Sequence, residues 1–329
     1  MTFARVLFAL VVALILVAVS LTLGVRSIPT ASFVEAFAAY DSSNPDQIVV
    51  REMRLGRAVA ALLGGAALGL AGALMQILSR NPLADPGILG INGGAAFGVV
   101  VGIWGLRLSD PGTLVLPALA GAALAAILVL SLGTSRARGP DPVRLVLAGA
   151  ALSALFLSLT WVILITSRQS LAIYRYWVLG GFSQIEMSHL MAVAPLFFVG
   201  FALAILAAFL LNPLMLGDAT ARALGARVGL ARSIALSAVV LLCGTTVSLA
   251  GPIAFIGLFV PHLVRAFTRP DARTLAVGSS VLGGVLALAA DIIGRLIFSG
   301  QEIEAGVVIA LIGGPALIAL VQRRQEIRL

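Results

Sequence analysis

Ten apolar runs, each near the roughly 20 residues that cross a bilayer as an α-helix, follow one another along this chain. Only 11% of the 329 residues are charged, whereas a water-soluble domain carries about 25%. The pattern therefore predicts an all-α polytopic membrane protein with about ten transmembrane helices. The predicted helices cover residues 4–25, 57–78, 90–106, 114–133, 143–166, 189–211, 231–250, 253–268, 275–298 and 304–321.

The first run is expected to be a retained helix. The stretch from Val6 to Gly24 is longer than the roughly 7–15 apolar residues of a signal-peptide core. The letters VAVS within it leave cleavage open as an alternative.

The distribution of arginine predicts the orientation. Arginines are more frequent at one set of helix ends, and such ends face the cytoplasm. This bias places both termini in the cytoplasm and requires an even number of helices. The longest outer connection is 26–56, where a short helix is expected near Ser32–Tyr40. The connections are too short for a second domain, so residues 1–329 are predicted to form a single transmembrane domain.

The chain contains no lysine, and this excludes one class of chemistry. A P-loop ATPase needs a lysine on the β- and γ-phosphates, so ATP-driven transport would need a separate ATPase subunit. The net charge of +8 does not indicate nucleic-acid binding, because the arginines lie between apolar runs and form no single patch. Cys243 lies within an apolar run and is expected to be a small core residue.

Two segments interrupt the helical pattern with proline and glycine. One is Asn81–Gly87, with the sequence NPLADPG, on the predicted inner side. The other is Ala250-Gly251-Pro252, on the predicted outer side. Proline lacks a backbone donor and glycine accepts positive φ, so both segments should form sharp, irregular turns. Such backbone occurs in membranes where protein buries it or where it lines a cavity.

The inner connection from Leu216 to Gly225 predicts a short helix at the cytoplasmic face. Asp218 is the expected N-cap and Gly225 the expected C′ residue, with about two helical turns between them. One interpretation is a plain interfacial helix. The other is a peg that docks into a cytoplasmic partner.

Few charged residues lie within the predicted spans. Asp291 and Arg295 are spaced i, i+4 and can pair on one helix face. An ion-coupled secondary transporter, with Asp291 or Glu186 as the coupling group, is therefore a second hypothesis. His189 and His262 are isolated, so we expect no metal site. No nucleophile or paired-acid arrangement indicates an enzyme.

Several stretches from about residue 51 to the C-terminus resemble the FecCD-type permeases of ABC importers for iron-siderophores, haem and cobalamin. They read RLGRAVAALLGGAALGLAGALMQ, SRNPLADPGILGINGGAA, RYWVLGGF, LGDATARALGARV, AGPIAFIGLFVPHLVR, ADIIGR and GVVIALIGGPALIALVQRR. Within the family, LCG followed by GPIAFIGL, together with ADIIGR, is most similar to ferric-enterobactin permease subunits. Gly56 departs from the proline that the family usually has there, which loosens a turn.

The resemblance implies a type II ABC importer permease fold in the bacterial inner membrane. The implied partners are a second permease subunit, identical or paralogous, two cytoplasmic ATPase subunits that bind ATP and Mg²⁺, and a periplasmic substrate-binding protein. No cofactor is expected on this chain itself.

The resemblance also implies roles for particular residues. The helix 143–166 resembles the wall of the transport pathway. The inner gate would comprise Asn81, Pro82, Leu83, Asp85 and Pro86. The helix that couples to the ATPase would comprise Gly217, Asp218, Ala219, Thr220, Arg222, Leu224 and Gly225, within 217–225. The surface that docks the binding protein would contain Arg54, Arg57 and Arg295; the alternative is that these arginines reach lipid headgroups or, for Arg295, pair only with Asp291.

Overall fold

The computed structural model describes residues 3–24, 28–135, 139–268, 271–297 and 301–326. Within these ranges the regular structure is helical, apart from one antiparallel pair of two-residue strands, β1 (Thr134–Ser135) and β2 (Gly139–Pro140). The all-α class is therefore confirmed. Residues 25 and 298, at the ends of two predicted helices, lie outside the described ranges.

Each predicted apolar run carries an α-helix. Six helical segments are long and apolar enough to span a membrane, and four further apolar helices are shorter. The helices on the predicted runs are α1 (Phe3–Thr22), α4 (Leu55–Ser79), α5 (Ile91–Leu106), α6 (Pro111–Gly133), α7 (Pro142–Thr166), α9 (Met187–Leu211), α11 (Val228–Ala250), α12 (Ile256–Phe267), α13 (Ala272–Leu296) and α14 (Ala305–Glu326).

Short helices occupy the connections. The predicted helix near Ser32–Tyr40 is confirmed as α2 (Thr30–Ala38), and α8 (Arg168–Trp177) lies in a connection for which no helix was predicted. The remaining short elements are α3 (Pro45–Ile48), α10 (Asp218–Ala223), the π-helix η1 (Val49–Arg54) and the 3₁₀-helices η2 (Pro86–Leu89) and η3 (Pro213–Leu216).

Helix α4 starts earlier than its apolar run predicts. Its backbone is continuous with η1 and α3, so helical structure extends from Pro45 to Ser79 over 35 residues. At 1.5 Å per residue this segment is about 50 Å long, well beyond the roughly 30 Å of a bilayer core. Because Arg51, Glu52 and Arg54 are charged, the helix was predicted to start after them, at residue 57. The structure places these three residues on the helical extension.

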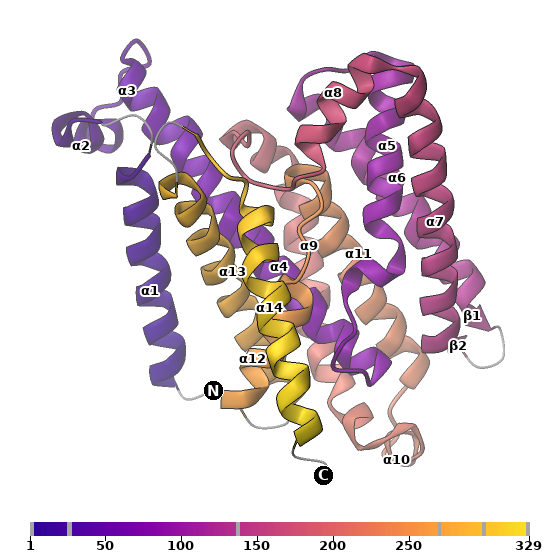
Figure 1. The fold of residues 1–329 in the computed structure, drawn as a ribbon. Helices are drawn as coiled ribbons and strands as arrows, with labels where there is room; N and C mark the ends of the chain where they lie inside the picture. Colours follow the sequence, from indigo (N-terminus) through magenta and orange to yellow (C-terminus); the bar gives the residue numbers. More distant parts are fainter. Residues whose placement is uncertain (1–2, 25–27, 136–138, 269–270, 298–300, 327–329) are drawn as a thin grey trace.

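Helix α4 packs closely against α13 and α12 in the middle of the molecule (Figure 1). A Cβ atom on Gly69 would lie 2.1 Å from Ser279 O, and one on Gly72 would lie 1.9 Å from Gly257 O. Only glycine permits such contacts between backbones.

Helix α12 begins later along the chain than predicted. After α11 ends at Ala250, residues 251–255 have no regular structure, and α12 begins at Ile256, three residues after the predicted start at 253. Gly251 and Phe255 both have positive φ, of 71° and 68°. The irregular turn that proline and glycine predict is therefore present and reaches Phe255.

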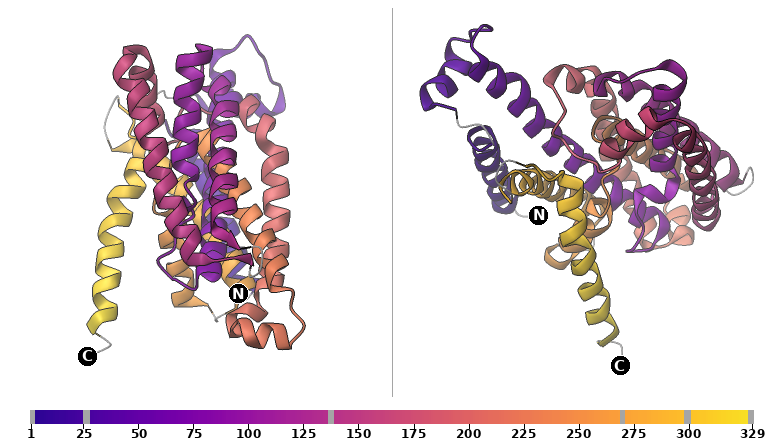
Figure 2. Two further views of the ribbon diagram at one scale, coloured as in Figure 1. Left: turned by 90° about the vertical axis from the view of Figure 1, so that its right-hand side faces the viewer. Right: turned by 45° about the horizontal axis from the view of Figure 1, so that its top comes forward.

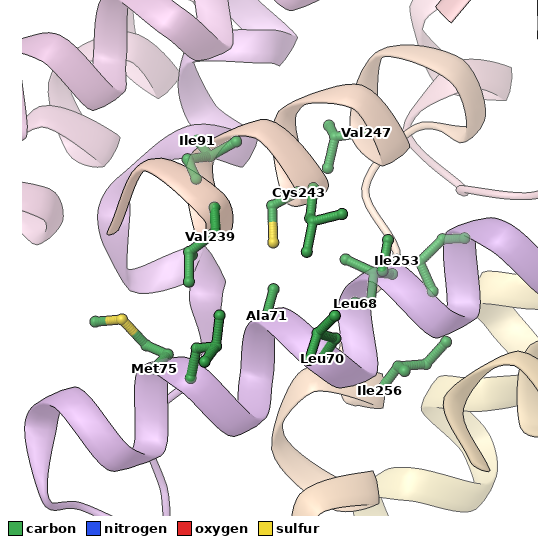
Figure 3. Close-up of a cluster of buried hydrophobic side chains, with 14 of the residues drawn as sticks. Leu68, Leu70, Ala71, Met75, Ile91, Val239, Cys243, Val247, Ile253 and Ile256 are labelled. Atoms are coloured by element: carbon green, nitrogen blue, oxygen red, sulfur yellow. The ribbon is translucent and has the colours of Figure 1, made fainter. Parts of the chain in front are cut away.

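Cys243 is a core residue, as expected. It is a free thiol with 2% of its surface exposed, and it points from α11 toward Ala71 of α4 among apolar side chains (Figure 3). The surrounding residues include Val239 and Val247 of the same helix.

The molecule has two distinct ends (Figures 1 and 2). One end carries α10 and the β1–β2 pair, and α1 begins and α14 ends on that side; we call it the α10 end. The opposite end carries α2, α3 and α8, and we call it the α8 end. The candidate site residues lie at these two ends.

Candidate functional site

The segment 217–225 forms the predicted short helix at the α10 end. Gly217 has a φ of 105° and occupies the N-cap position, and Gly225, with a φ of 81°, follows the helix in the left-handed region. Gly225 therefore takes the predicted C′ position. The prediction that Asp218 is the N-cap is wrong, because Asp218 is the first helical residue and Gly217 precedes it as the cap.

One face of this helix is anchored and the other is free in the described structure. Ala221 is fully buried, whereas Arg222 and Leu224 are exposed, together with Ala219 and Thr220. Leu224 exposes 66% of its surface and nearby Leu216 exposes 68%. Large apolar side chains presented beside a short helix are typical of a surface that receives a protein partner.

The carboxylate of Asp218 does not cap the helix but lies between two arginines. Arg80 donates to Oδ1 from the end of α4, and Arg232 Nη2 donates to Oδ2 from α11 across 2.8 Å. Arg80 is also the C-cap of α4, with left-handed backbone angles of φ 51° and ψ 28°. Asp218 therefore joins three elements at the α10 end.

The NPLADPG loop is a compact irregular turn. Asn81 Oδ1 accepts from Leu83 N at 3.0 Å, and Asp85 Oδ1 accepts from Gly87 N at 2.7 Å. Removal from water raises the pKa of the Asp85 carboxyl, and the hydrogen bond from Gly87 opposes that rise. The side chain of Leu83 is 44% exposed, so it is available to contact a pathway or a partner.

The NPLADPG loop contacts helix α12 inside the molecule. A Cβ atom on Gly257 would lie 2.7 Å from Pro86 Cδ, so the loop packs directly on the start of α12. Gln76, one turn before the loop, donates to Leu258 O at 3.1 Å and accepts from Arg265. The loop is therefore in contact with α12 as well as with α4.

At the α8 end, the three arginines expected to dock a partner are buried. Their exposed fractions are 6% for Arg54, 8% for Arg57 and 5% for Arg295. Arg57 Nε lies 2.9 Å from Asp291 Oδ1, and Arg57 Nη1 lies 2.6 Å from Glu302 Oε2. The predicted pairing of Asp291 with Arg295 is confirmed.

The same guanidinium groups also hold the first helix. Arg295 Nη2 donates to Ser20 Oγ at 2.7 Å, and Arg54 Nη1 donates to Leu21 O at 2.9 Å. Arg295 therefore contacts α1 in addition to its ion pair with Asp291. In this structure the three side chains are buried and satisfy groups of their own chain, because a charge inside a helix bundle needs a partner.

A cavity of about 460 Å³ lies between α8, the start of α6, the start of α9 and the end of α11. Its lining combines the aromatic rings of Tyr176 and Trp177 with polar side chains. Among these, Ser183 Oγ donates to Glu304 Oε1 at 2.5 Å, which links the connection after α8 to the start of α14.

In the described part of the chain, the residues that an ion-coupled transporter or a metal site would use are not arranged for ion exchange or metal binding. Asp291 is fully buried between two arginines, and Glu186 is exposed at the start of α9. The described residues contain no group of three or more His, Cys, Asp or Glu that could hold a metal ion. His189 packs against Gly112, where an added Cβ would lie 2.1 Å from its Nε2.

Sequence reasoning missed the partners of the site residues. It assigned no role to Arg80, Arg232, Ser20 or Glu302, each of which contacts a predicted site residue. It also assigned none to Gln76, which contacts α12. One signal was available: a charged or amide side chain at the end of an apolar run needs a partner at that depth. The identity of the partner depends on how distant helices pack, and no local pattern shows it.

Comparison with known proteins places this arrangement in a family. The sequence matches the model of the FecCD transport family over residues 11–323. It is 41% identical to the ferric enterobactin transport system permease protein FepD of Escherichia coli (strain K12), over 96% of this chain and 94% of that protein. It is 36% identical to the vitamin B12 import system permease protein BtuC of Yersinia enterocolitica, over 87% and 85%.

The fold agrees with a solved structure as well. A structure described as an inward-facing conformation of a metal-chelate type ABC transporter superposes with a TM-score of 0.83 at 26% identity, covering 98% of this chain and 100% of that chain. The helices and their two ends therefore define a polytopic ABC transporter permease of type II fold. The chain belongs to the FecCD transport family.

Proposed function

We propose that this chain is the membrane subunit of an ATP-driven importer that carries an iron-siderophore, or a related iron, haem or cobalamin chelate, across the bacterial inner membrane. The observation that carries the proposal is the family match over residues 11–323. The relatives include permeases named for ferric enterobactin and for vitamin B12, so the family alone leaves the chelate open. The higher identity to the enterobactin permease favours a ferric siderophore.

ATP hydrolysis is assigned to two separate subunits that bind ATP and Mg²⁺. The chain lacks the lysine of a P-loop, and the exposed face of α10 offers Arg222 and Leu224 to such a partner. The α10 end then faces the cytoplasm, which also places the start of α1 and the end of α14 on that side. The loop with Leu83 lies close to this end and serves as the inner gate.

The α8 end faces a periplasmic binding protein in this proposal. In this conformation Arg54, Arg57 and Arg295 act on docking indirectly, by holding α1, α4 and α13 in place under the outer surface. A second permease subunit, identical or paralogous, completes the pathway. The exposed apolar face of α7, with Leu147 at 65% and Ile165 at 80% exposure, lies against that subunit or against lipid.

The test is uptake in a strain that lacks this chain. Radioactive iron is supplied as ferric enterobactin, ferric citrate or a ferric hydroxamate, and radioactive cobalamin is supplied in parallel. We expect the loss of uptake of one ferric siderophore and its return with the plasmid-borne chain. Normal uptake of all these compounds would contradict the substrate assignment.

The ion-coupled alternative is separated by the energy source. Uptake by the proposed importer should stop when ATP is depleted and continue when a protonophore collapses the proton gradient at constant ATP. The reverse result would favour coupling to ions. The burial of Asp291 between Arg57 and Arg295 argues against that result, because a coupling carboxylate must be able to exchange its ion.

A further inference from the structure

We propose that Asp218 is a positioning residue that transmits movement of α10 to the loop 81–87, through its ion pair with Arg80. The inference rests on the proposed function, in which α10 receives the ATPase and the loop is the inner gate. It adds the physical connection between them. Asp218 was predicted to cap α10, but Gly217 occupies the N-cap position, so the Asp218 carboxylate does not serve as the cap.

The Asp218 carboxylate is placed to join α10, the element that moves in this proposal, to the long helix α11. Arg232 belongs to the long helix α11, and its side chain is only 13% exposed, so it anchors Asp218 from inside the protein. The Arg80 side chain is 53% exposed, so it contacts Asp218 from the solvent side. Asp218 itself is intermediate, with 27% of its side chain exposed.

Arg80 is the residue that starts the loop. Its left-handed backbone ends α4, and Asn81 follows directly. Arg80 Nη2 also lies 3.5 Å from Leu214 O in η3, the element that leads into α10. A displacement of α10 therefore acts through the Arg80 side chain on the backbone from which the loop begins.

The loop is built to move as one piece. The side chains of Asn81 and Asp85 each close a turn onto a backbone amide two residues later, and Pro82 and Pro86 fix two φ angles. A rigid loop passes a displacement at residue 80 on to Leu83, whereas a flexible one would absorb it. Pro86, seated against Gly257, is the other end of this rigid piece.

The connection is not needed to hold the fold together. The Arg80–Asp218 pair is open to water, and such ion pairs contribute little to stability. The more buried contact with Arg232 keeps an acceptor in Asp218→Asn, whose amide oxygen can accept from the guanidinium. The capping role at the start of α10 belongs to Gly217, and Ala221 buries the helix against the protein. Replacement of the Asp218 carboxylate should therefore leave α10 formed.

The experiment uses the complete importer in proteoliposomes, with Cys243→Ala as the background. A cysteine at Leu83 is labelled with fluorescein maleimide with and without ATP and Mg²⁺, and uptake of ferric enterobactin is measured per ATP hydrolysed. In Asp218→Asn, co-purification of the ATPase and ATP hydrolysis are measured in parallel, so that a change in coupling is separated from a change in ATPase binding or turnover. The nucleotide-dependent difference in labelling, and the uptake per ATP, should each fall about fivefold or more, within the usual range of coupling between two sites.

Two further variants test the route. Arg80→Gln should show the same defect, and the double variant with Asp218→Asn should be no worse than either single one, because both changes remove one shared contact. Asp218→Glu should restore part of the coupling. The matched control is Asp141→Asn, which alters the N-cap of α7, where Asn caps as well as Asp.

The outcomes separate this inference from the proposed function. Unchanged labelling and unchanged uptake per ATP in Asp218→Asn, with the ATPase still bound, would overturn the role of Asp218 and leave the importer assignment standing. Additive defects in the double variant would also overturn it. If the unaltered chain fails to retain any ATPase, the proposed function fails instead.

Discussion

Arg57 Nε donates a hydrogen bond to Asp291 Oδ1 across 2.9 Å, although 234 residues separate these two along the chain. The Asp291 side chain is fully buried and is shared with Arg295, while Glu302 accepts from the other side of the Arg57 guanidinium. Through Ser20, this network also includes α1. Three helices that are distant in the sequence are therefore joined at the α8 end by one set of charges.

Removal of one member of this network should destabilise the protein. Arg57→Ala leaves the Asp291 carboxylate with one cation fewer in a buried site, a change that costs about 3–5 kcal/mol when a buried pair is broken. We expect a clear decrease in the apparent melting temperature of the detergent-purified chain. The measurement is a thermal shift assay that follows loss of the monodisperse peak on size exclusion.

The control is Arg51→Ala on the same helical segment. Arg51 is exposed and lies 4.5 Å from the ring centroid of Tyr40, so its removal should change stability by about 0.5 kcal/mol or less. Equal melting temperatures for the two variants would show that the network contributes nothing to stability. A charge reversal at Arg57 should likewise weaken folding, so a loss of docking in that variant would not by itself identify a docking residue.

The glycine contacts between α4 and α13 predict a second stability effect. Gly69→Ala places a methyl group 2.1 Å from Ser279 O, so the two helices must separate. We expect a destabilisation of roughly 1–3 kcal/mol, the usual cost of overpacking a core. The matched change is Gly105→Ala in α5, where nothing lies within 4 Å and alanine should be neutral or favourable. The prediction fails if both variants melt together.

The exposed side chain of Leu83 predicts a change at the loop during ATP turnover. Leu83→Cys, in the Cys243→Ala background, should react with a water-soluble maleimide at a rate that depends on ATP and Mg²⁺, because a gate alternates between open and closed states. The reaction rate is followed by gel fluorescence. A cysteine at the exposed α8-end residue Leu171 serves as the comparison and should label at one constant rate. Equal rates for Leu83→Cys in all nucleotide conditions would exclude a gate at this residue.

The local pattern of apolar residues was sufficient to predict the ten apolar helices, but not to predict which helices contact one another. Ten apolar runs predicted ten helices because roughly 20 apolar residues are required by the bilayer itself. The start of α4 was misplaced because Arg51, Glu52 and Arg54 resemble the end of a span, whereas they continue a helix that is longer than the membrane. Helix α8 was missed because its composition is too polar for a span.

The site residues were located by sequence, but their surroundings were not. Asp218 has the residue type of an N-cap, yet Gly217 before it takes that position and turns the carboxylate toward Arg80 and Arg232. Arg57 and Arg295 resemble exposed cations at helix ends, yet the packing of α4 on α13 buries both beside Asp291. In each case the outcome depends on a partner from another part of the chain, which no spacing rule supplies.

The exposed face of α10 predicts where the ATPase binds. Arg222 and Leu224 lie on the side of this helix that the protein leaves uncovered, and Ala221 holds the opposite side in the core. Truncation of an interface residue that carries much of the binding energy costs roughly 2 kcal/mol or more. The double variant Arg222→Glu with Leu224→Ala should therefore release the ATPase when the complex is purified in detergent, and uptake should stop while expression and the melting temperature of the chain stay unchanged.

The matched control is Arg175→Glu with Leu171→Ala, which changes an exposed arginine and an exposed leucine on α8, at the opposite end of the molecule. In that control the ATPase should remain bound and its basal hydrolysis should be normal. Full retention of the ATPase by the α10 variant, with unchanged ATP turnover, would show that the partner binds elsewhere on the chain.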